Sequence, residues 1–533
     1  MSTLTGTGSL VRFMLRRERL RLGLWVSILA LVPIGTANAF IGLYPDEASR
    51  RALVATVASS PALTALLGPL YDSGIGGLVT WRSGTIAAFM VALMAILTMI
   101  RHTREEEETG RRELLGSTVL GRHAPRAAAA TVTVGAGAVL TGLLTAGLIG
   151  VGLPAAGSLA FGLGLLGVTI VFTGVGALAA QLTEAASTGR GIGVGIAGAA
   201  FLLRMAGDAG GEEVEWMAWL SPIGWFSRLR PFADEMWWVL ALWLLLGLAL
   251  GAAATVIASR RDVGAGAFPP RPGPARARAG LGSPLGLAWR LQRGAVIGWA
   301  AGLVALGAVY GASGESVSDM LEGNPALLEI FEQLGGEQGL TDAFFSAAVG
   351  IIALITSAFA IRAVLRLRVE EEGLRAEPVL ATATPRTRWV WSHLLFGLVG
   401  PALILALAAV SAGATYGAII DDVGGQVPRI VGAAMVQLPA VWVVTGSAMA
   451  LYGLAPHRVG LSWAVLIGSL ILGQLGQILQ FPQWSLNLSP FSHVPRFPAE
   501  DVDLLPLAVL LGIAVVLIGS GLAGFRNRDV QPG

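Results

Sequence analysis

The chain has 533 residues, of which 54% are hydrophobic and only 13% are charged, and its formal net charge is +2. Soluble globular proteins carry about 25% charged residues, so this composition excludes an ordinary soluble domain and indicates a polytopic membrane protein. The chain has no cysteine, which excludes disulfides and thiolate metal sites. It also has no lysine, so all 36 basic residues are arginines.

Apolar runs long enough to cross a bilayer, roughly 17–25 residues each, recur along the whole chain. In chain order, the sequence predicts spans at 22–40, 83–100, 127–150, 156–180, 188–206, 237–258, 294–311, 345–365, 389–413, 430–453, 459–480 and 504–525. The expected fold class is therefore an all-α polytopic membrane protein with twelve transmembrane helices. Several runs are rich in glycine and alanine, which lets helices approach closely and favours a compact bundle.

Arginine is distributed unevenly between the two sets of connecting segments. If the N-terminus is inside, the inner segments hold 28 of the 36 arginines. Positively charged residues are enriched in cytoplasmic loops. We therefore expect a multi-pass protein of the plasma membrane with both termini in the cytoplasm.

Three segments outside the spans have a recognisable pattern in each half. A basic amphipathic stretch, 9–20 or 283–293, precedes the first span and is expected to lie flat in the inner interface. The outer loop after the first span has helix-like apolar spacing at 50–68. Tryptophan- and proline-rich outer stretches at 215–232 and 481–497 predict broken helices before the sixth and twelfth spans.

Eight positions of the inner loop after the second span recur 264 residues later. Arg104, Glu106, Glu107, Glu108, Arg111, Glu113, Thr118 and Arg122 become Arg368, Glu370, Glu371, Glu372, Arg375, Glu377, Thr382 and Arg386. Other short matches follow in the same order at shifts of 264 to 274. Because six is even, both halves enter the membrane the same way, which predicts two parallel six-helix repeats with pseudo-twofold symmetry along the membrane normal.

The repeat also predicts the domain organisation. We expect a first six-helix half at 1–258 with an N-terminal interfacial helix, and a second half at 283–533. Between them, residues 259–282 are rich in proline, glycine and arginine, which is typical of a disordered cytoplasmic linker.

The acidic inner loops are predicted to be short surface helices of mixed charge. Three acid-first i,i+4 pairs support this, namely Glu107–Arg111, Glu108–Arg112 and Glu371–Arg375. A plain solvated loop is the alternative. Because both halves keep the pattern while the surrounding sequence diverges, we favour two docking surfaces for a soluble partner.

These features together resemble an ABC type-2 exporter permease, in the fused twelve-helix form of the actinobacterial polyketide-antibiotic and multidrug exporter permeases. The resemblance implies export of an amphiphilic or hydrophobic compound such as an antibiotic, drug or lipid. It implies that two copies of an ABC ATP-binding subunit, which carry the ATP and Mg, dock on coupling helices at Arg104, Glu106, Glu107, Glu108, Arg111, Glu113, Arg368, Glu370, Glu371, Glu372, Arg375 and Glu377. The halves differ there, since Val369 replaces Glu105 and Pro378 replaces Leu114.

The ATPase is expected on a separate polypeptide. A phosphate-binding loop of the G-x-x-x-x-G-K-S/T type needs a lysine, and this chain has none. The chain is therefore predicted to be a transport subunit rather than an enzyme, with no cofactor, metal or catalytic residue of its own. Its expected partners are the ATPases, membrane lipid and the substrate, without nucleic acid.

Polar residues inside predicted spans are candidates for the substrate path, because such residues usually face the bundle interior. They are Arg204, Gln437, Gln474, Gln477 and Gln480. A polar outer gate is one interpretation, and hydrogen bonding between helices or snorkelling to the interface is the other.

Two other classes of protein remain as alternatives. An ion-coupled secondary transporter with six-plus-six repeats would be expected to bury carboxylates near the middle of the membrane, and no assigned span contains one there. A membrane enzyme acting on lipid-linked substrates would use Asp421 and Asp422 as metal ligands, although a solvated loop is the simpler interpretation of this pair.

Overall fold

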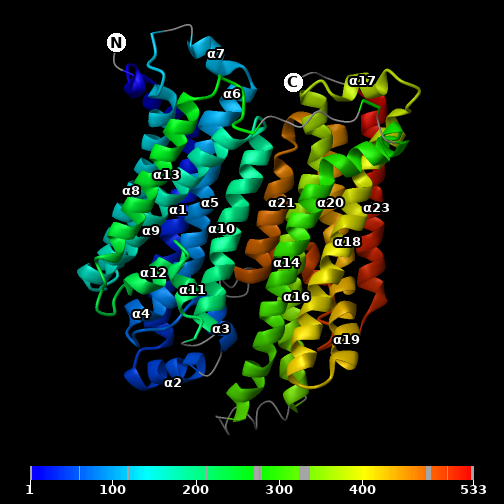
Figure 1. The fold of residues 1–533 in the computed structure, drawn as a ribbon. Coiled ribbons are helices and arrows are strands. Elements are labelled where there is room, and N and C mark those ends of the chain that lie inside the picture. The colour runs from blue at the N-terminus through cyan, green and yellow to red at the C-terminus, as the bar shows by residue number, and fades with distance from the viewer. Residues whose placement is uncertain are drawn as a thin grey trace. The chain divides into compact units, whose positions relative to one another are not determined.

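A computed structural model describes residues 3–58, 61–116, 119–209, 213–268, 275–276, 279–322, 336–475, 482–500 and 502–529. Every regular element in these ranges is a helix, as the composition predicts. The chain divides into two compact units, Met1–Gly273 and Pro274–Gly533. In Figure 1, unit 1 runs from blue to green and unit 2 from green to red.

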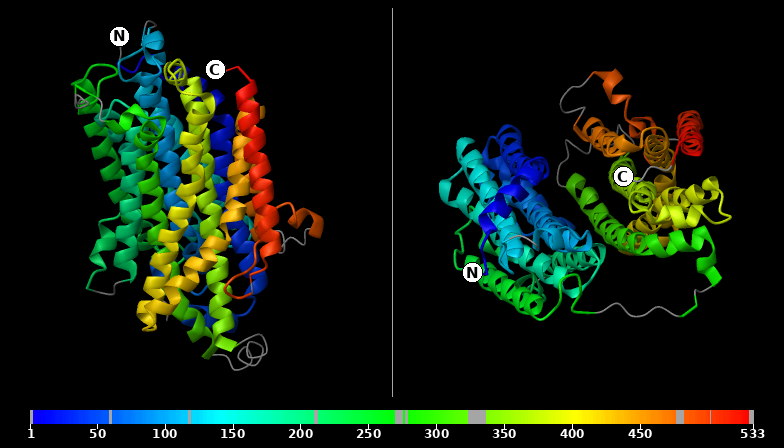
Figure 2. Two further views of the ribbon diagram at one scale, coloured as in Figure 1. Left: turned by 90° about the vertical axis from the view of Figure 1, so that its right-hand side faces the viewer. Right: turned by 90° about the horizontal axis from the view of Figure 1, so that it is seen from above.

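Unit 1 combines long helices, which run roughly parallel to one another (Figures 1 and 2), with short ones at both ends. Its elements are α1 (Thr7–Leu43), α2 (Glu47–Ala58), α3 (Pro61–Leu67), α4 (Ile75–Val79), η1 (Thr80–Gly84), α5 (Thr85–Ile100), η2 (Arg101–Glu105), α6 (Glu106–Glu108), α7 (Arg111–Gly116), α8 (Ala124–Gly150), α9 (Ala155–Leu182), α10 (Ala186–Ala209), α11 (Trp216–Trp219), α12 (Gly224–Leu229) and α13 (Val239–Ser259).

Unit 2, within its described residues, also combines long helices with short ones. Its elements are η3 (Ala279–Gly282), α14 (Pro284–Glu322), α16 (Gly336–Glu372), α17 (Ala376–Leu380), α18 (Arg386–Ile419), α19 (Val423–Val436), α20 (Leu438–Leu454), η4 (Pro456–Arg458), α21 (Leu461–Leu470), η5 (Ile471–Leu475), α22 (Gln483–Leu486), η6 (Pro490–His493) and α23 (Leu504–Asn527).

Glycine allows the closest helix contacts in each unit, as the small-residue composition predicts. In unit 1, a Cβ on Gly167 of α9 would come within 2.5 Å of the Trp243 ring of α13. In unit 2, a Cβ on Gly453 of α20 would lie 1.9 Å from the carbonyl oxygen of Gly521 on α23. Any larger residue at these positions would force the helices apart.

Eleven helices of the described chain are long and apolar enough to cross a membrane. They correspond to the predicted spans except the one at 459–480, which is described only to residue 475, as α21 followed by η5. The span at 459–480, the total of twelve spans and the symmetry between the halves therefore stay predictions. The predicted breaks within 215–232 and 481–497 are confirmed, because α11 and α12, and likewise α22 and η6, are separate short helices.

The basic stretches before the first span of each half do not form separate helices. Residues 9–20 are the first turns of α1, which continues without a break to Leu43, and residues 284–293 likewise begin α14. In α1, helix propensity explains this, because Leu, Arg, Met and Glu dominate Leu10–Leu22 and this stretch contains neither proline nor glycine.

Candidate functional site

The acidic loop of unit 1, which is predicted to face the cytoplasm, is a helix corner, residues 101–116, which we call acidic corner 1. The second span continues beyond α5 through the π-helical turn η2 into α6, which ends at Glu108. Gly110 then adopts a φ of 71°, and α7 begins at Arg111. A residue in the left-handed region ends a helix, and glycine enters that region without steric cost.

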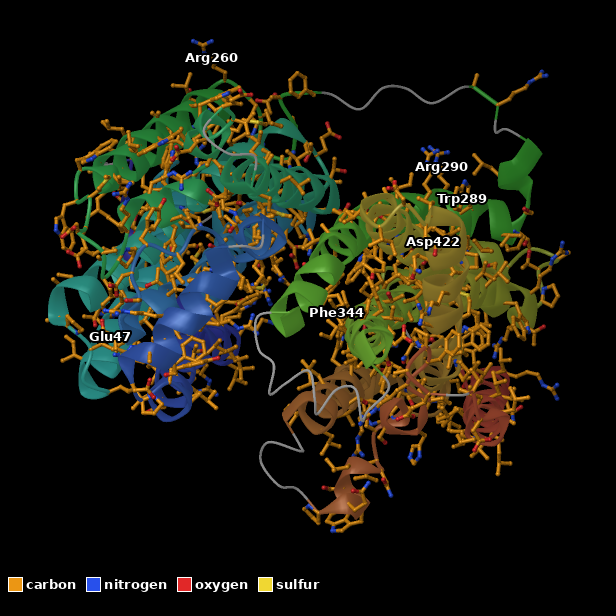
Figure 3. All side chains as sticks on the ribbon, turned by 90° about the horizontal axis from the view of Figure 1, so that it is seen from below. Glu47, Arg260, Trp289, Arg290, Phe344 and Asp422 are labelled. Atoms are coloured by element: carbon orange, nitrogen blue, oxygen red, sulfur yellow. The ribbon has the colours of Figure 1, made fainter. Side chains whose placement is uncertain are left out.

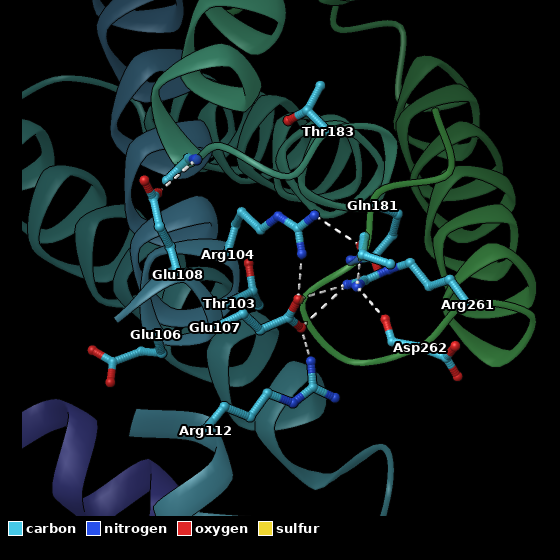
Figure 4. A network of polar contacts seen from close by, with 12 residues as sticks. Thr103, Arg104, Glu106, Glu107, Glu108, Arg112, Gln181, Thr183, Arg261 and Asp262 are labelled. Carbon is cyan, nitrogen blue, oxygen red and sulfur yellow. Dashed lines mark hydrogen bonds and ion pairs between the residues drawn. The ribbon is translucent and has the colours of Figure 1, made fainter. Parts of the chain in front are cut away.

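The carboxylate of Glu107 is the centre of acidic corner 1 (Figure 4). Arg104 Nη1 lies 2.5 Å, and Arg261 Nη2 2.9 Å, from Glu107 Oε2, while Arg112 pairs with Oε1. The Glu107 side chain is only 1% exposed. A carboxylate buried this deeply needs opposite charges and hydrogen bonds in place of its lost water, and three guanidinium groups supply them.

Glu106 joins acidic corner 1 to the first span. Its Oε1 pairs with Arg17 of α1 and lies 3.4 Å from Arg111 Nη1. The Glu106 side chain is 11% exposed, compared with 1% for that of Glu107. The corner is therefore fixed both to α1 and to the segment that follows α13.

The corresponding loop of unit 2, residues 366–380, is acidic corner 2. Here α16 runs without a break to Glu372, Leu374 adopts a φ of 56°, and α17 begins at Ala376. Glu371 accepts two hydrogen bonds from Arg528, at 2.6 and 2.8 Å, in a bidentate pair.

Aromatic rings support that pair. The guanidinium carbon of Arg528 lies 5.1 Å from the ring centres of both Tyr452 and Phe525. Burial alone would lower the pKa of Arg528, but its hydrogen bonds to Glu371 and the charge of that carboxylate raise the pKa above its ordinary value. The adjacent Glu370 pairs with Arg366 at 2.6 Å and with Arg375 at 2.9 Å.

The ion pairs within the two corners differ in register from the prediction. The arginines that follow each turn pair with the glutamate five positions earlier rather than four: Arg111 with Glu106, Arg112 with Glu107, and Arg375 with Glu370. The predicted i,i+4 register is wrong because it assumes an unbroken helix. Gly110 and Leu374, both at positive φ, break that helix between the partners.

The twelve residues predicted to couple to an ATPase separate into two groups. Six of them are buried or partly buried and form the base of each corner. Arg104, Glu106, Glu107, Glu370 and Glu371 are buried, and Arg368 is partly buried. The remaining six are exposed and occupy equivalent positions at a shift of 264: Glu108, Arg111, Glu113, Glu372, Arg375 and Glu377.

The residues that close the base from outside the loops were missed from the sequence. Arg261 follows the last span of unit 1 and Arg528 follows the last span of unit 2, and each reaches the central glutamate of its corner. They are 267 residues apart, close to the shift of 264 between the loops. This nearly equal spacing was the available signal.

The beginning of the expected linker is ordered against unit 1, in what we call the strap, residues 261–268. The backbone amide of Ala267 donates to the carbonyl of Gln181 at 2.8 Å, and that of Phe268 donates to Leu182 at 3.1 Å. Arg104 Nη2 donates to the carbonyl of Ala265 at 2.8 Å. Burial of Arg261 lowers its pKa below the ordinary value.

At the other end of unit 1, Arg204 of α10 is held within the protein. Its Nη1 lies 3.1 Å from Asp208 Oδ2, and its Nη2 donates to the carbonyls of residues 65 and 66 at 2.7 and 3.0 Å. Arg228 of α12 reaches the same carboxylate at 3.1 Å. These contacts favour the helix-bonding interpretation of Arg204 over an outer gate. Asp208 was missed, although its position four residues after Arg204 was a usable signal.

The glutamines predicted along the substrate path are only partly described. Gln437 lies at the break between α19 and α20 and is 7% exposed, so it faces the interior of unit 2. Gln474 has its backbone in η5, but its side chain, and all of Gln477 and Gln480, lie outside the described residues. A role in the substrate path stays a prediction for all four.

Asp421 and Asp422 have a local structural role. Asp422, labelled in Figure 3, caps α19 by accepting a hydrogen bond from the Gly425 amide at 3.0 Å. Asp421 occupies the preceding turn with a φ of 56°. Among the described residues, no group of three or more acidic or histidine side chains is placed to hold a metal ion.

Comparison with known proteins gives two matches. The family described as "Multidrug efflux system permease Rv1217c, C-terminal domain" matches residues 281–526. The multidrug efflux system permease protein Rv1217c of Mycobacterium tuberculosis is 43% identical over 537 residues, which cover 99% of this chain and 96% of that protein.

Proposed function

We propose, from the premise that this chain belongs to the family of multidrug efflux system permeases, that it is the membrane subunit of an ABC exporter. Two copies of a separate ATP-binding subunit would dock on acidic corners 1 and 2 from the cytoplasm. ATP hydrolysis on those subunits would drive an amphiphilic compound out of the cell. The name of the relative, a permease within an efflux system, supports both the direction and the need for other components.

The paired construction of the corners is the observation that carries this proposal. Each corner ends a span, has a buried glutamate neutralised by arginine at its base, and presents an acid, an arginine and an acid outward: Glu108, Arg111 and Glu113, or Glu372, Arg375 and Glu377. A rigid base under an exposed, charged tip is suited to transmitting a partner's motion to the attached span. The outward residues rather than the buried ones would contact the ATPase.

The two docking surfaces would differ in chemistry. On corner 2, Val369 and Leu374 are each about half exposed, at 45% and 51%. Their counterparts at a shift of 264 are Glu105 and Gly110. Corner 2 therefore offers apolar contacts where corner 1 offers charge, so we expect the ATPase to bind the two corners with unequal affinity.

The composition supports an energy supply from a separate subunit. Without lysine, the chain cannot build the usual phosphate-binding loop of an ATPase. The buried carboxylates that an ion-coupled transporter would need are instead in ion pairs: Glu18 lies 2.9 Å from Arg101, and Asp208 lies 3.1 Å from Arg204.

Co-purification tests the proposal. The chain would be expressed with the ATP-binding subunit encoded beside it, and retention of that subunit and ATP-dependent transport in vesicles would be measured. We expect charge reversal of all six outward residues to abolish both while leaving the chain folded and in the membrane. Reversal of Glu47, an exposed acid on α2 at the opposite end of unit 1, is the matched control and should change neither.

Two results would contradict the proposal. The ATPase could remain bound, with transport intact, in the six-residue variant. Alternatively, the chain reconstituted alone could transport substrate with a proton gradient as its only energy source, which would identify it as a secondary transporter.

A further inference from the structure

A pocket with a basic lining lies within unit 1, between the first turns of α1, the turn η2 and the start of α8. It is a partly enclosed hollow that opens to the surface. Three arginines, Arg17, Arg112 and Arg126, line it, and the single acidic residue in the lining is Glu106. The lining therefore has an excess of positive charge even when His102 is neutral.

One of these arginines has capacity for a ligand. Arg126 is 8% exposed and its Nη2 contacts His123, but its Nη1 is buried without a hydrogen-bond partner among the described residues. A buried guanidinium nitrogen without a partner is costly, so an anion at this position would be strongly favoured. Burial, together with the smaller effect of Arg126 and other neighbouring arginines, also lowers the pKa of Arg112 to about 10.

The opening of the pocket continues into an apolar stripe on α1. Phe13, which lines the pocket, is more than half exposed, and so are Leu20, Leu24 and Ile28. Their spacing of seven, four and four residues places them on one face of the helix. A helix of 37 residues is about 55 Å long, whereas the hydrocarbon core is about 30 Å thick, so the first turns of α1 project to the depth of the head groups.

We propose that this pocket binds the phosphate group of an anionic amphiphile, with Arg126, Arg17 and Arg112 around the phosphate and the acyl chains along the stripe from Phe13 to Ile28. Phosphate suits the site because guanidinium groups bind it through paired, charge-assisted hydrogen bonds. An anionic phospholipid supplies both parts of such a ligand, and a soluble phosphate supplies only the first. The inference depends on membrane embedding and not on the ATPase proposal.

The site is specific to the first half. At the shifts that relate the halves, Arg17, Arg112 and Arg126 correspond to Leu291, Ala376 and Val390. Ala376 and Val390 are buried in an apolar cluster with Trp389 and Phe525. We therefore expect one phosphate site per chain.

Lipid binding to the purified full-length chain tests this. Native mass spectrometry would follow titration with palmitoyl-oleoyl-phosphatidylglycerol, with phosphatidylcholine as the comparison lipid and inorganic phosphate as a soluble competitor. We expect one phosphatidylglycerol to bind in preference to phosphatidylcholine, and Arg126→Gln to weaken this binding about tenfold or more, the effect of one charged hydrogen bond. Arg17→Gln, at a more exposed position, provides a second test if Arg126→Gln folds poorly.

The controls separate the sources of the phosphate. Arg16→Gln removes an exposed arginine from the same helix and should leave binding unchanged. Phe13→Asp should weaken binding of phosphatidylglycerol only. If inorganic phosphate binds, if this binding is lost in Arg126→Gln but unchanged in Phe13→Asp, and if no lipid is retained, the site is the same but its ligand is a soluble phosphate. If Arg126→Gln and Arg17→Gln bind phosphatidylglycerol as well as Arg16→Gln does, the proposal is overturned.

Discussion

Acidic corners 1 and 2 each contain a buried glutamate at an equivalent position, but the two carboxylates are neutralised in different ways. Glu107 is surrounded by Arg104, Arg112 and Arg261, which come from three segments. Glu371 has one bidentate partner, Arg528, which rests on aromatic rings, with Arg368 more distant at 3.8 Å. The comparison indicates that the position requires a buried carboxylate, whereas the arrangement of cations around it is free to vary.

The largest expected effect comes from removing the central carboxylate. Glu107→Gln would leave three clustered guanidinium groups without their anion, and we expect it to destabilise the chain by about 4 kcal/mol, within the usual cost of breaking a buried pair. Glu371→Gln should cost about 2–3 kcal/mol, because it leaves mainly Arg528, whose side chain is 15% exposed and can turn toward water. Thermal unfolding midpoints in one detergent would measure both.

The control for this prediction is Glu113→Gln, which changes an exposed residue of the same loop and should shift the midpoint very little. Equal losses for Glu107→Gln and Glu371→Gln would show that the number of surrounding arginines does not matter.

Removing the arginine that follows the last span should have the opposite ranking: the loss of stability should be larger in corner 2 than in corner 1. Arg528→Gln takes away the main partner of Glu371, so we expect a loss of about 3 kcal/mol. Arg261→Gln leaves Glu107 with Arg104 and Arg112, so about 1–2 kcal/mol is expected, the cost of lost hydrogen bonds. The measurement is again the unfolding midpoint.

A double-mutant cycle sharpens this result. Glu371→Gln combined with Arg528→Gln should show a coupling of about 2 kcal/mol, since the two residues interact directly. A cycle between Glu107 and Arg261 should show a smaller coupling. Similar couplings in both corners would contradict the distinction between a glutamate with three close arginines and one with a single main arginine.

A substitution in the strap should cause a smaller loss of stability, and it tests corner 1 alone. A Cβ on Gly266 would lie 2.9 Å from the carbonyl carbon of Thr183 and 3.0 Å from the amide nitrogen of Glu184. We expect Gly266→Ala to displace the strap at a cost of about 1–2 kcal/mol and to increase protease cleavage within 261–268. Gly280→Ala, where a Cβ meets nothing within 4 Å, is the matched control and should behave as wild type.

The sequence predicted the two corners and their spacing but not their construction. Apolar run length and the 264-residue shift are local or repeated signals, so the spans and the paired loops were accessible from the sequence. The partners of Glu107 and Glu371 were not, because Arg261 and Arg528 lie 154 and 157 positions away in the chain. The i,i+4 prediction failed for local reasons, since it overlooked Gly110 as a helix terminator in corner 1, and Leu374 gives no sign in the sequence that it will adopt a positive φ in corner 2. The basic pocket was missed because burial of Arg126 depends on how α1 and α8 pack.

The smallest expected effect concerns the turn itself, where Leu374 stands in place of Gly110. A non-glycine residue in the left-handed region costs about 1–2 kcal/mol, and this is partly offset by the greater unfolded-state entropy of glycine, about 0.5–1 kcal/mol. Because Leu374 is half exposed, little burial is lost on replacement. We therefore expect Leu374→Gly to stabilise the chain by up to about 1 kcal/mol. Gly110→Ala should destabilise it by a similar amount because of the positive φ alone, since a Cβ there meets no neighbour within 4 Å.

An exposed leucine in the left-handed region lowers stability, and the proposed ATPase surface would give this residue a compensating role. Leu374→Gly should therefore raise the unfolding midpoint while it weakens binding of the ATP-binding subunit. Leu374→Asn tolerates the same backbone conformation but removes the apolar contact, so it should weaken binding in the same way. Unchanged ATPase binding in both variants would show that Leu374 does not contact the partner, and the proposed difference between the two docking surfaces would then rest on Val369 and the charges alone.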